Sequence, residues 1–253
     1  MRSEGRAAHQ RVVLIIQARM GSTRLPGKSM MPLAGEPLIG RLLERVKGCQ
    51  EVDQIVLAIP DTPENEVLAG VGLEWGVAVY SGSEGDLVDR YYQAAQKFSA
   101  DVVVRLPGDN PVPEPGEIDR IIAHHLRGRA AFSTNITQLL GNGYPDGIGA
   151  EVFDFKSLEE VWRRQDDPLK REHLHLNFFD YATGQVVDSE QYPVATVSCP
   201  AGFSRPDLVL DVNTPAEYAY LKALYSALYP KNPQFHITDI IAWHDGIDGK
   251  VPL

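Results

Sequence analysis

The chain has 253 residues, 43% of them hydrophobic and 23% charged, which suits one globular α/β domain or such a domain with an attached lobe. The formal net charge of −10 argues against a protein that binds duplex nucleic acid, but it leaves room for a local basic pocket. The two cysteines are too few for a disulfide framework, and no apolar run approaches the ~18 residues of a membrane span.

In chain order, residues 1–11 are polar and lack the apolar stretch of a signal peptide, so we expect a flexible tail and a cytoplasmic protein. From residue 12 onward, apolar runs bounded by Gly and Pro alternate with helical periodicity. The runs predict strands at 12–16, 54–59, 77–80, 101–106, 131–134 and 209–213. The periodicity predicts helices at 37–47, 86–98, 117–125 and 215–228.

This alternation predicts a single doubly wound, mostly parallel sheet of the Rossmann-like type, with right-handed crossovers between strands. We expect one domain over 12–253. A glycine-rich loop at 138–149 opens the segment in which we expect an inserted lobe, which extends to about residue 200. Ligands of such sheets bind at the carboxyl ends of the strands, and the unusual residues of this sequence cluster there.

The loop at 17–28 directly follows the first predicted strand and carries three cations, Arg19, Arg24 and Lys28, with two glycines and two hydroxyl side chains. Backbone N–H groups beside arginine and lysine form a cradle for phosphate oxygens. Five residues rather than four separate the two glycines, so the loop is not a Walker A motif and we reject a P-loop ATPase. A solvated basic turn is the alternative.

Oxygen-bearing side chains follow two further predicted strands. Asp109 lies on a Gly-Asp turn, where it can bind Mg²⁺ opposite a phosphate loop or simply bond its own backbone. Asp211 and Asn213 lie two apart on a predicted strand and share a face, so we expect a second metal ligand there. Helix capping alone explains the next three polar or helix-initiating positions: Thr214, Pro215 and Glu217.

These residues carry a resemblance to the CTP-dependent cytidylyltransferases of acidic sugars, the superfamily of CMP-Kdo and CMP-sialate synthetases. The chain is most similar to the branch named for spore-coat polysaccharide biosynthesis. The matching stretches run in family order over nearly the whole chain. They are IIQARMGSTRLPGK at 15–28, PLAGEPLI at 32–39, YSGSEGDLVDRYYQAA at 80–95, VVVRLPGDNP at 102–111, YPDGIGAEVF at 144–153, REH at 171–173 and RPDLVLDVNTPAEY at 205–218.

The resemblance implies a homodimeric enzyme that transfers CMP from CTP to a nonulosonate- or Kdo-like acidic sugar for surface glycans, with Mg²⁺ as cofactor and release of pyrophosphate. It implies catalytic roles for Lys28, Arg19 and Asp109. It implies nucleotide contacts by Ala18, Arg19, Gly21, Ser22, Arg24, Lys28 and Arg105. It implies that 12–253 is a nucleotidyltransferase domain whose inserted lobe serves acceptor binding and dimerisation. It implies acceptor contacts by Asp146, Glu151, Arg171 and His173, although a solvated helix face also explains Arg171.

The second metal carboxylate of the family aligns with Asn213, which is a departure from the family pattern. Either the amide oxygen of Asn213 serves, or Asp211 on the same face takes over. We place Asp211 first, beside Asp109, because a carboxylate binds a hard dication better than a neutral amide does.

Three other functions remain open at this point. The same fold can use another nucleotide or a phosphorylated or phosphonate acceptor, or it can bind nucleotide without catalysis. The combination of the basic loop with Asp109 argues against a silent relative, because binding alone needs no metal carboxylate. A glycosyltransferase would typically carry an Asp-x-Asp motif, and Asp211 is followed by Val and Asn. We expect no nucleic-acid or membrane partner.

Overall fold

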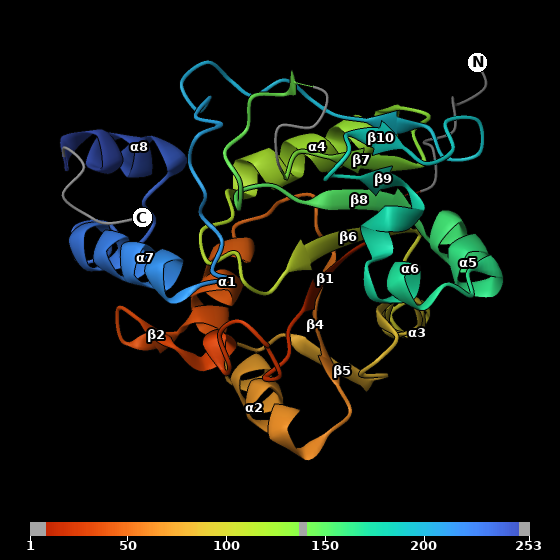
Figure 1. The fold of residues 1–253 in the computed structure, drawn as a ribbon, viewed down its shortest axis with the longest axis horizontal. Helices are drawn as coiled ribbons and strands as arrows, with labels where there is room; N and C mark the ends of the chain where they lie inside the picture. Colours follow the sequence, from red (N-terminus) through yellow and green to blue (C-terminus); the bar gives the residue numbers. More distant parts are fainter. Residues whose placement is uncertain (1–8, 137–140, 248–253) are drawn as a thin grey trace, which may run out of the picture.

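The structure is a computed structural model that describes residues 9–136 and 141–247, and its centre is a seven-stranded sheet (Figure 1). The strand order is β11-β7-β8-β6-β1-β4-β5, and β8 alone runs antiparallel to its neighbours. The strands are β1 Val12–Gln17, β4 Gln54–Pro60, β5 Ala78–Gly82, β6 Val102–Pro107, β7 Phe132–Thr134, β8 Glu151–Asp154 and β11 Val194–Ala195. The predicted mostly parallel α/β sheet is confirmed.

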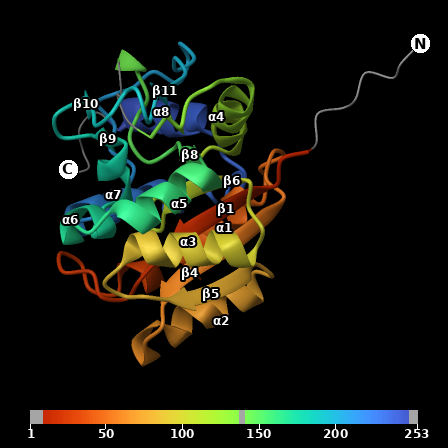
Figure 2. The ribbon, with the colours of Figure 1, turned by 90° about the vertical axis from the view of Figure 1, so that its right-hand side faces the viewer.

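Helices cover both faces of this sheet (Figure 2). They are α1 Leu38–Val46, α2 Glu66–Glu74, α3 Leu87–Lys97, α4 Pro115–Arg127, α5 Phe155–Arg164, α6 Pro168–Glu172, α7 Pro215–Leu228 and α8 Ile237–Gly246. Side chains alternate along β1, so Val13 and Ile15 pack with α3 and α5, whereas Leu14 and Ile16 pack with α1, α2 and α4. The continuous apolar run of β1 is therefore buried on both faces, as a central parallel strand requires.

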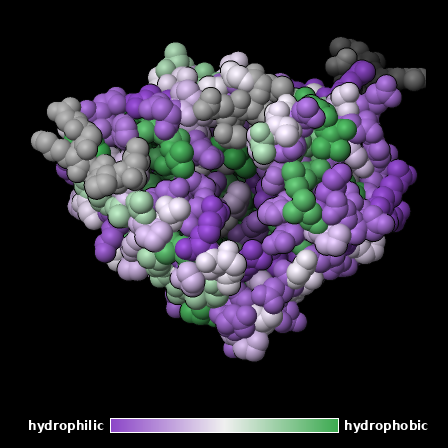
Figure 3. Space-filling model, viewed as in Figure 1, coloured by the Kyte–Doolittle hydropathy of each residue, from purple (hydrophilic) through white to green (hydrophobic). Residues whose placement is uncertain are grey.

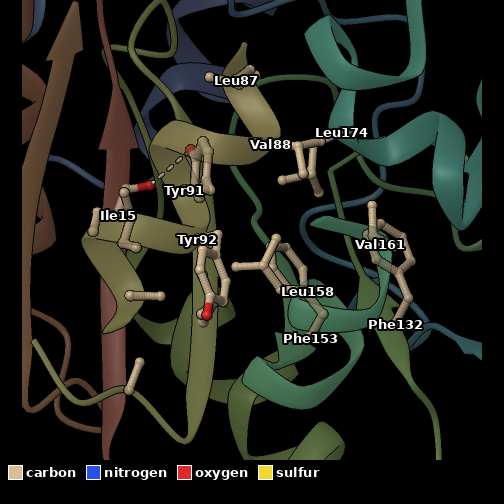
Figure 4. Packing of buried hydrophobic residues seen from close by; sticks show 14 of the residues in the cluster. Ile15, Leu87, Val88, Tyr91, Tyr92, Phe132, Phe153, Leu158, Val161 and Leu174 are labelled. Carbon is tan, nitrogen blue, oxygen red and sulfur yellow. Dashed lines mark hydrogen bonds between the residues drawn. The ribbon is translucent and has the colours of Figure 1, made fainter. Parts of the chain in front are cut away.

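Helix α3 is fixed over the sheet by Tyr91, which is fully buried (Figure 4). The Tyr91 hydroxyl donates a hydrogen bond to the backbone oxygen of Ile15 on β1 (3.1 Å). At the start of the helix, the Asp86 side chain caps it by accepting from the backbone N–H of Asp89 (2.9 Å). The Tyr91 bond ties α3 to β1, and the Asp86 cap fixes where the helix begins.

The predicted strand at 209–213 is wrong. Within that segment only Val209 pairs, in an isolated parallel bridge with Asp146. Leu210 and Val212 are buried in a cluster with α7 and α8, so their apolar alternation reflects packing on helices rather than a place in the sheet. Two-residue ribbons complete the fold: β2 Pro32–Leu33 with β3 Glu36–Pro37, and β9 Phe179–Asp180 with β10 Gln185–Val186.

Part of the segment expected as an inserted lobe is integral to the central sheet. Strand β8 lies between β6 and β7, β11 forms one edge, and α5 packs against α3. What lies outside the sheet is α6, the short helix Leu174–Asn177 and the β9–β10 ribbon. Sequence periodicity could not reveal this, because β8 has only four residues and an antiparallel strand needs no helical crossover.

Two predicted segments, the N-terminal tail and the glycine-rich loop, fall partly outside the described residues. Residues 1–8 of the expected tail and 138–140 of the expected loop lie outside the described residues. Residues 9–11 are tied to the body, because His9 bonds to Asp53 (2.9 Å) and the Arg11 backbone N–H donates to Asp101 (2.7 Å). None of the helices in the described parts of the chain is long and apolar enough to cross a membrane.

Candidate active site

A polar cleft opens at the carboxyl ends of β1 and β6, as expected for a doubly wound sheet. It encloses about 900 Å³ of empty space when its open mouth is included. Figure 3 shows this face of the molecule hollowed near its middle, with hydrophilic residues around the hollow. The polar residues that line the cleft are Gln17, Arg19, Ser22, Thr23, Arg24, Lys28, Ser29, Glu84, Arg90, Arg105, Asp109, Glu172, His173 and Asn213.

Lys28 occupies a cradle of three oxygen atoms at one end of the cleft. Its ammonium donates to Asp109 Oδ2 (2.7 Å), to the Val212 carbonyl (2.7 Å) and to Asn213 Oδ1 (3.1 Å). The side chains of Lys28 and Asp109 are 13% and 23% exposed, so solvent screens this ion pair less than a surface pair. A carboxylate, an amide and a main-chain carbonyl thus converge on one cationic point.

Asn213 is the side chain that joins the basic loop to this cradle. Its Oδ1 also accepts from Arg24 Nη2 (2.7 Å), and its Nδ2 donates to Asp211 Oδ2. The geometry therefore places Asn213 against Lys28 and Arg24, while Asp211 lies behind Asn213 and does not line the cleft.

Backbone contacts position Asn213. The Val212 N–H donates to the Asp109 carbonyl (2.9 Å), which ties this segment to the turn after β6. Glu217 Oε2 accepts from the backbone N–H groups of both Asn213 (2.6 Å) and Thr214 (2.8 Å). Thr214 and Glu217 form the capping box of α7, which confirms the predicted capping. The same Glu217 carboxylate orients Asn213 in the cleft.

Behind the cradle lies a group of partly buried carboxylates. Burial raises the pKa of Asp211 to about 7, and the negative charges of Asp146 and Asp109 add to the shift. Burial likewise raises the pKa of Asp146 to about 6, with Asp109 contributing. Asp146 does not line the cleft. Its backbone instead pairs with Leu208 (3.0 Å) and Leu210 (3.1 Å), which supports the segment that carries Asn213.

The floor of the cleft contains a buried ion pair. Arg105 Nη1 donates to Glu151 Oε2 (2.6 Å) and its Nε donates to Gln17 Oε1 (2.9 Å). The other oxygen of Glu151 accepts from the Tyr181 hydroxyl (2.8 Å), and Glu151 is 0% exposed. Arg105 therefore faces the cleft with its charge already matched, whereas Glu151 holds Arg105 in place from below.

The helix α6 side of the cleft presents His173 and Glu172 rather than Arg171. Arg171 Nε donates to Asp86 Oδ2 (2.6 Å) and its Nη1 donates to the Gln165 carbonyl (2.7 Å), so it fastens α6 to the start of α3. Arg19 reaches Glu172 across the mouth at 3.5 Å, and both side chains are about half exposed (44% and 51%).

The structure thus brings many of the residues named from sequence to one cleft and leaves others outside it. The named residues in the lining are Ala18, Arg19, Ser22, Arg24, Lys28, Arg105, Asp109, His173 and Asn213. The named residues outside the lining are Gly21, Asp146, Glu151, Arg171 and Asp211.

Sequence reasoning missed three charged residues of the lining, Glu84, Arg90 and Glu172. Arg90 lies on the buried stripe of α3, between Leu87 and Tyr91. A charged residue within an apolar helical stripe was the available signal, because burial of a charge needs a compensating partner.

The fold and this cleft define an α/β nucleotidyltransferase. A sequence profile of the cytidylyltransferase family matches residues 13–190, and the chain belongs to this family of CTP-dependent nucleotidyltransferases. The predicted family and enzyme class are confirmed.

Similar proteins agree with this assignment. The chain is 32% identical over 219 residues to the spore coat polysaccharide biosynthesis protein SpsF of Bacillus subtilis, covering 85% of this chain and 86% of that one. It is 36% identical over 125 residues to a 3-deoxy-manno-octulosonate cytidylyltransferase of Anaeromyxobacter dehalogenans, and this match spans 49% of this chain and half (50%) of that relative. Among solved structures, a cytidylyltransferase from Leptospira borgpetersenii superposes with a TM-score of 0.84 at 28% identity, covering 96% and 97% of the two chains.

Proposed function

We propose that the protein transfers CMP from CTP to a small acidic acceptor, with release of pyrophosphate. The observation that carries the proposal is the oxygen cradle around Lys28, which lies beside the cationic loop at the carboxyl ends of β1 and β6. Phosphoryl transfer needs little covalent chemistry from the protein, so positioning and neutralisation of charge are the main tasks.

The cradle fits Mg²⁺ by its chemistry, since its three atoms are hard oxygen donors. The described residues contain no group of three or more His, Cys, Asp or Glu side chains that could hold a metal ion. Mg²⁺ often binds through one or two carboxylates and the phosphates of a substrate, so the oxygen donors of the cradle would need the phosphates of a nucleotide to complete a site. Asp109 and Asn213 would hold the ion, which would neutralise charge on the α-phosphate and the attacking oxygen.

The basic side chains of the cleft would bind the triphosphate. Lys28 and a metal ion cannot share the cradle, because two cations there would repel, so Lys28 is expected to turn to phosphate oxygens when nucleotide binds. Arg24 and Arg19 would neutralise further phosphate charge. An acceptor oxygen then attacks the α-phosphorus in line, a new P–O bond forms, and the bond to pyrophosphate breaks.

The acceptor and the biological role form the finer part of the proposal. The relatives named for spore coat polysaccharide biosynthesis and for 3-deoxy-manno-octulosonate support an acidic sugar destined for a surface glycan. His173 on α6 would contact the acceptor, while Arg171 and Glu151 would act by fixing the helix α6 and Arg105. A cytoplasmic location and a homodimer without nucleic-acid or membrane partners complete the proposal.

Pyrophosphate release tests this function directly. Each of the four nucleoside triphosphates is offered with Mg²⁺ against a panel of acidic sugars and phosphorylated or phosphonate acids. We expect turnover with CTP and at least one acidic sugar, and loss of that turnover in Asp109→Asn. Turnover with another nucleotide or only with a phosphorylated acid would replace the proposed substrates, and CTP binding without turnover against any acceptor would favour a binding protein.

A further inference from the structure

Arg90 is a buried cation at the cleft, and it forms no ion pair with any residue in the described part of the chain. It is 4% exposed, yet it belongs to the cleft lining. Its Nη1 donates to the Ser83 carbonyl (2.6 Å), whereas its Nε is buried and has no hydrogen-bond partner among the residues that the structure describes. Buried polar atoms are nearly always paired, so an unpaired one at a cleft indicates a missing partner.

The nearby carboxylates do not neutralise Arg90. Asp86 is held by Arg171 at 2.6 Å. Burial lowers the pKa of the Arg90 guanidinium, and Tyr91 partly opposes this shift. The positive charge of Arg19 lowers the pKa further, while Glu84 and Asp86 raise it by less. Two arginines of the cleft, one buried and one half-exposed, thus influence each other without a shared anion. Arg105 differs from Arg90 in this respect, because Arg105 forms an ion pair with Glu151.

We propose that Arg90 binds an anionic oxygen of a substrate, with Arg19 on the other side of that oxygen. This inference rests on the proposed function, and it adds a position distinct from the cradle of Lys28. A buried, unneutralised guanidinium gains far more from an anion than from a neutral group, because the anion removes the cost of the buried charge. The anion is either a phosphate oxygen of the nucleotide or the acid group of the acceptor.

The arrangement implies an opposite effect of Arg90 on stability and on binding. In the free protein, burial of the Arg90 charge without an anion destabilises the folded state, so Arg90→Gln should have a melting temperature no lower than that of the wild type. If Arg90 only supported the backbone at Ser83, its removal would lower the melting temperature and leave anion affinity unchanged. The two roles are therefore separable.

Calorimetric titration with three probes tests the inference: tripolyphosphate, 3-deoxy-manno-octulosonate and cytidine, each in Mg²⁺ buffer. We expect Arg90→Gln to lose at least about tenfold affinity for one of the two anions and none for cytidine, since tenfold corresponds to the loss of one charged contact. Arg90→Lys should recover part of the loss. Arg163→Gln, at an exposed arginine of α5 paired with Glu159, is the matched control and should bind as the wild type does.

The probe that loses affinity identifies the source of the anion. Unchanged affinity of Arg90→Gln for both anions, a wild type that binds neither anion, or a loss for cytidine alone would overturn the inference. Parallel titration with CTP separates the two proposals. A wild type that binds CTP and releases pyrophosphate while Arg90→Gln behaves identically removes the role of Arg90 alone, whereas a wild type without CTP binding removes the proposed function.

Discussion

Among single residues, Asn213 illustrates how a neutral side chain can take a place where a carboxylate would be expected. Its Oδ1 accepts from both Lys28 and Arg24, and its Nδ2 is fixed by Asp211. Asp211, the carboxylate that the sequence analysis placed first as a metal ligand, instead accepts from this amide and orients it. With one aspartate and one asparagine, Asp109 and Asn213, the cradle carries less negative charge than a pair of aspartates would supply.

Replacement of Asn213 should therefore harm activity more than replacement of Asp211. We expect Asn213→Ala to reduce turnover by about 100-fold, the usual cost of one preorganised electrostatic contact. Asp211→Asn keeps a side chain that can still accept from Asn213, so its loss should stay within about tenfold. The kcat of each variant and its Mg²⁺ dependence measure this. The reverse ranking would mean that Asp211 is the ligand.

Asp146 should make stability depend on pH. Its pKa in the folded protein is raised to about 6 by burial, so the folded state holds the proton more tightly than the unfolded state. Stability should then fall as pH rises from the unfolded value of about 4 to about 6, and the penalty should persist above that.

Asp146→Asn removes this penalty, so its stabilising effect should be present at pH 8 and nearly absent at pH 4. Urea unfolding of both proteins at several pH values, without nucleotide or metal, measures the difference. Asp180→Asn serves as a control at a surface carboxylate whose pKa is instead lowered, chiefly by its bond from Thr183. A difference between wild type and Asp146→Asn that is the same at every pH would show that folding does not raise the pKa of Asp146.

On the scale of elements, the cleft depends on how closely β1 and β6 approach at their carboxyl ends. Gly108, just after β6, lies against the end of β1, and a Cβ there would fall 2.4 Å from the Gln17 carbonyl and 3.0 Å from the Ala18 Cβ. The Gln17 carbonyl and the buried Ala18 side chain cannot make room for a Cβ at Gly108 unless β1 and β6 move apart. The position of Asp109 relative to the basic loop follows from this contact.

Gly108→Ala should consequently lower both stability and activity. We expect a loss of about 1–3 kcal/mol in the free energy of unfolding, typical of overpacking, and a loss of turnover larger than the unfolded fraction explains. Denaturant unfolding and kcat on the same preparation provide both values. Gly116→Ala, in α4 where an added Cβ has open space, is the control and should cost little. Equal behaviour of the two variants would remove the strand approach as a determinant of the site.

On the scale of the whole molecule, much of the fold and the basic part of the site could be predicted from the sequence. The buried parallel strands β1, β4 and β6 and the helices between them follow from apolar runs and helical periodicity. The basic loop and Asp109 were found because charged residues directly after buried strands are conspicuous. Residues that act through contacts far apart in sequence could not be found in that way.

Three such cases have physical causes. The segment 209–213 alternates like a strand because it packs on α7 and α8, and no sequence pattern distinguishes the two environments. Glu151 was expected in the cleft, but its antiparallel strand places it beneath Arg105. The sequence places Arg90 within the apolar stripe of α3, but only tertiary packing shows that its Nε is buried without a partner among the described residues.

Equilibrium titration of CTP, UTP, ATP and GTP in Mg²⁺ buffer, on the wild type and on Lys28→Ala, tests the central claim most directly. The account predicts that CTP binds most tightly and that Lys28→Ala weakens it by at least about tenfold, the effect of one charged contact to phosphate. The melting temperature of Lys28→Ala should stay close to that of the wild type. Equal affinity for all four nucleotides, or undiminished CTP binding by Lys28→Ala, would contradict a CTP site built on this cleft.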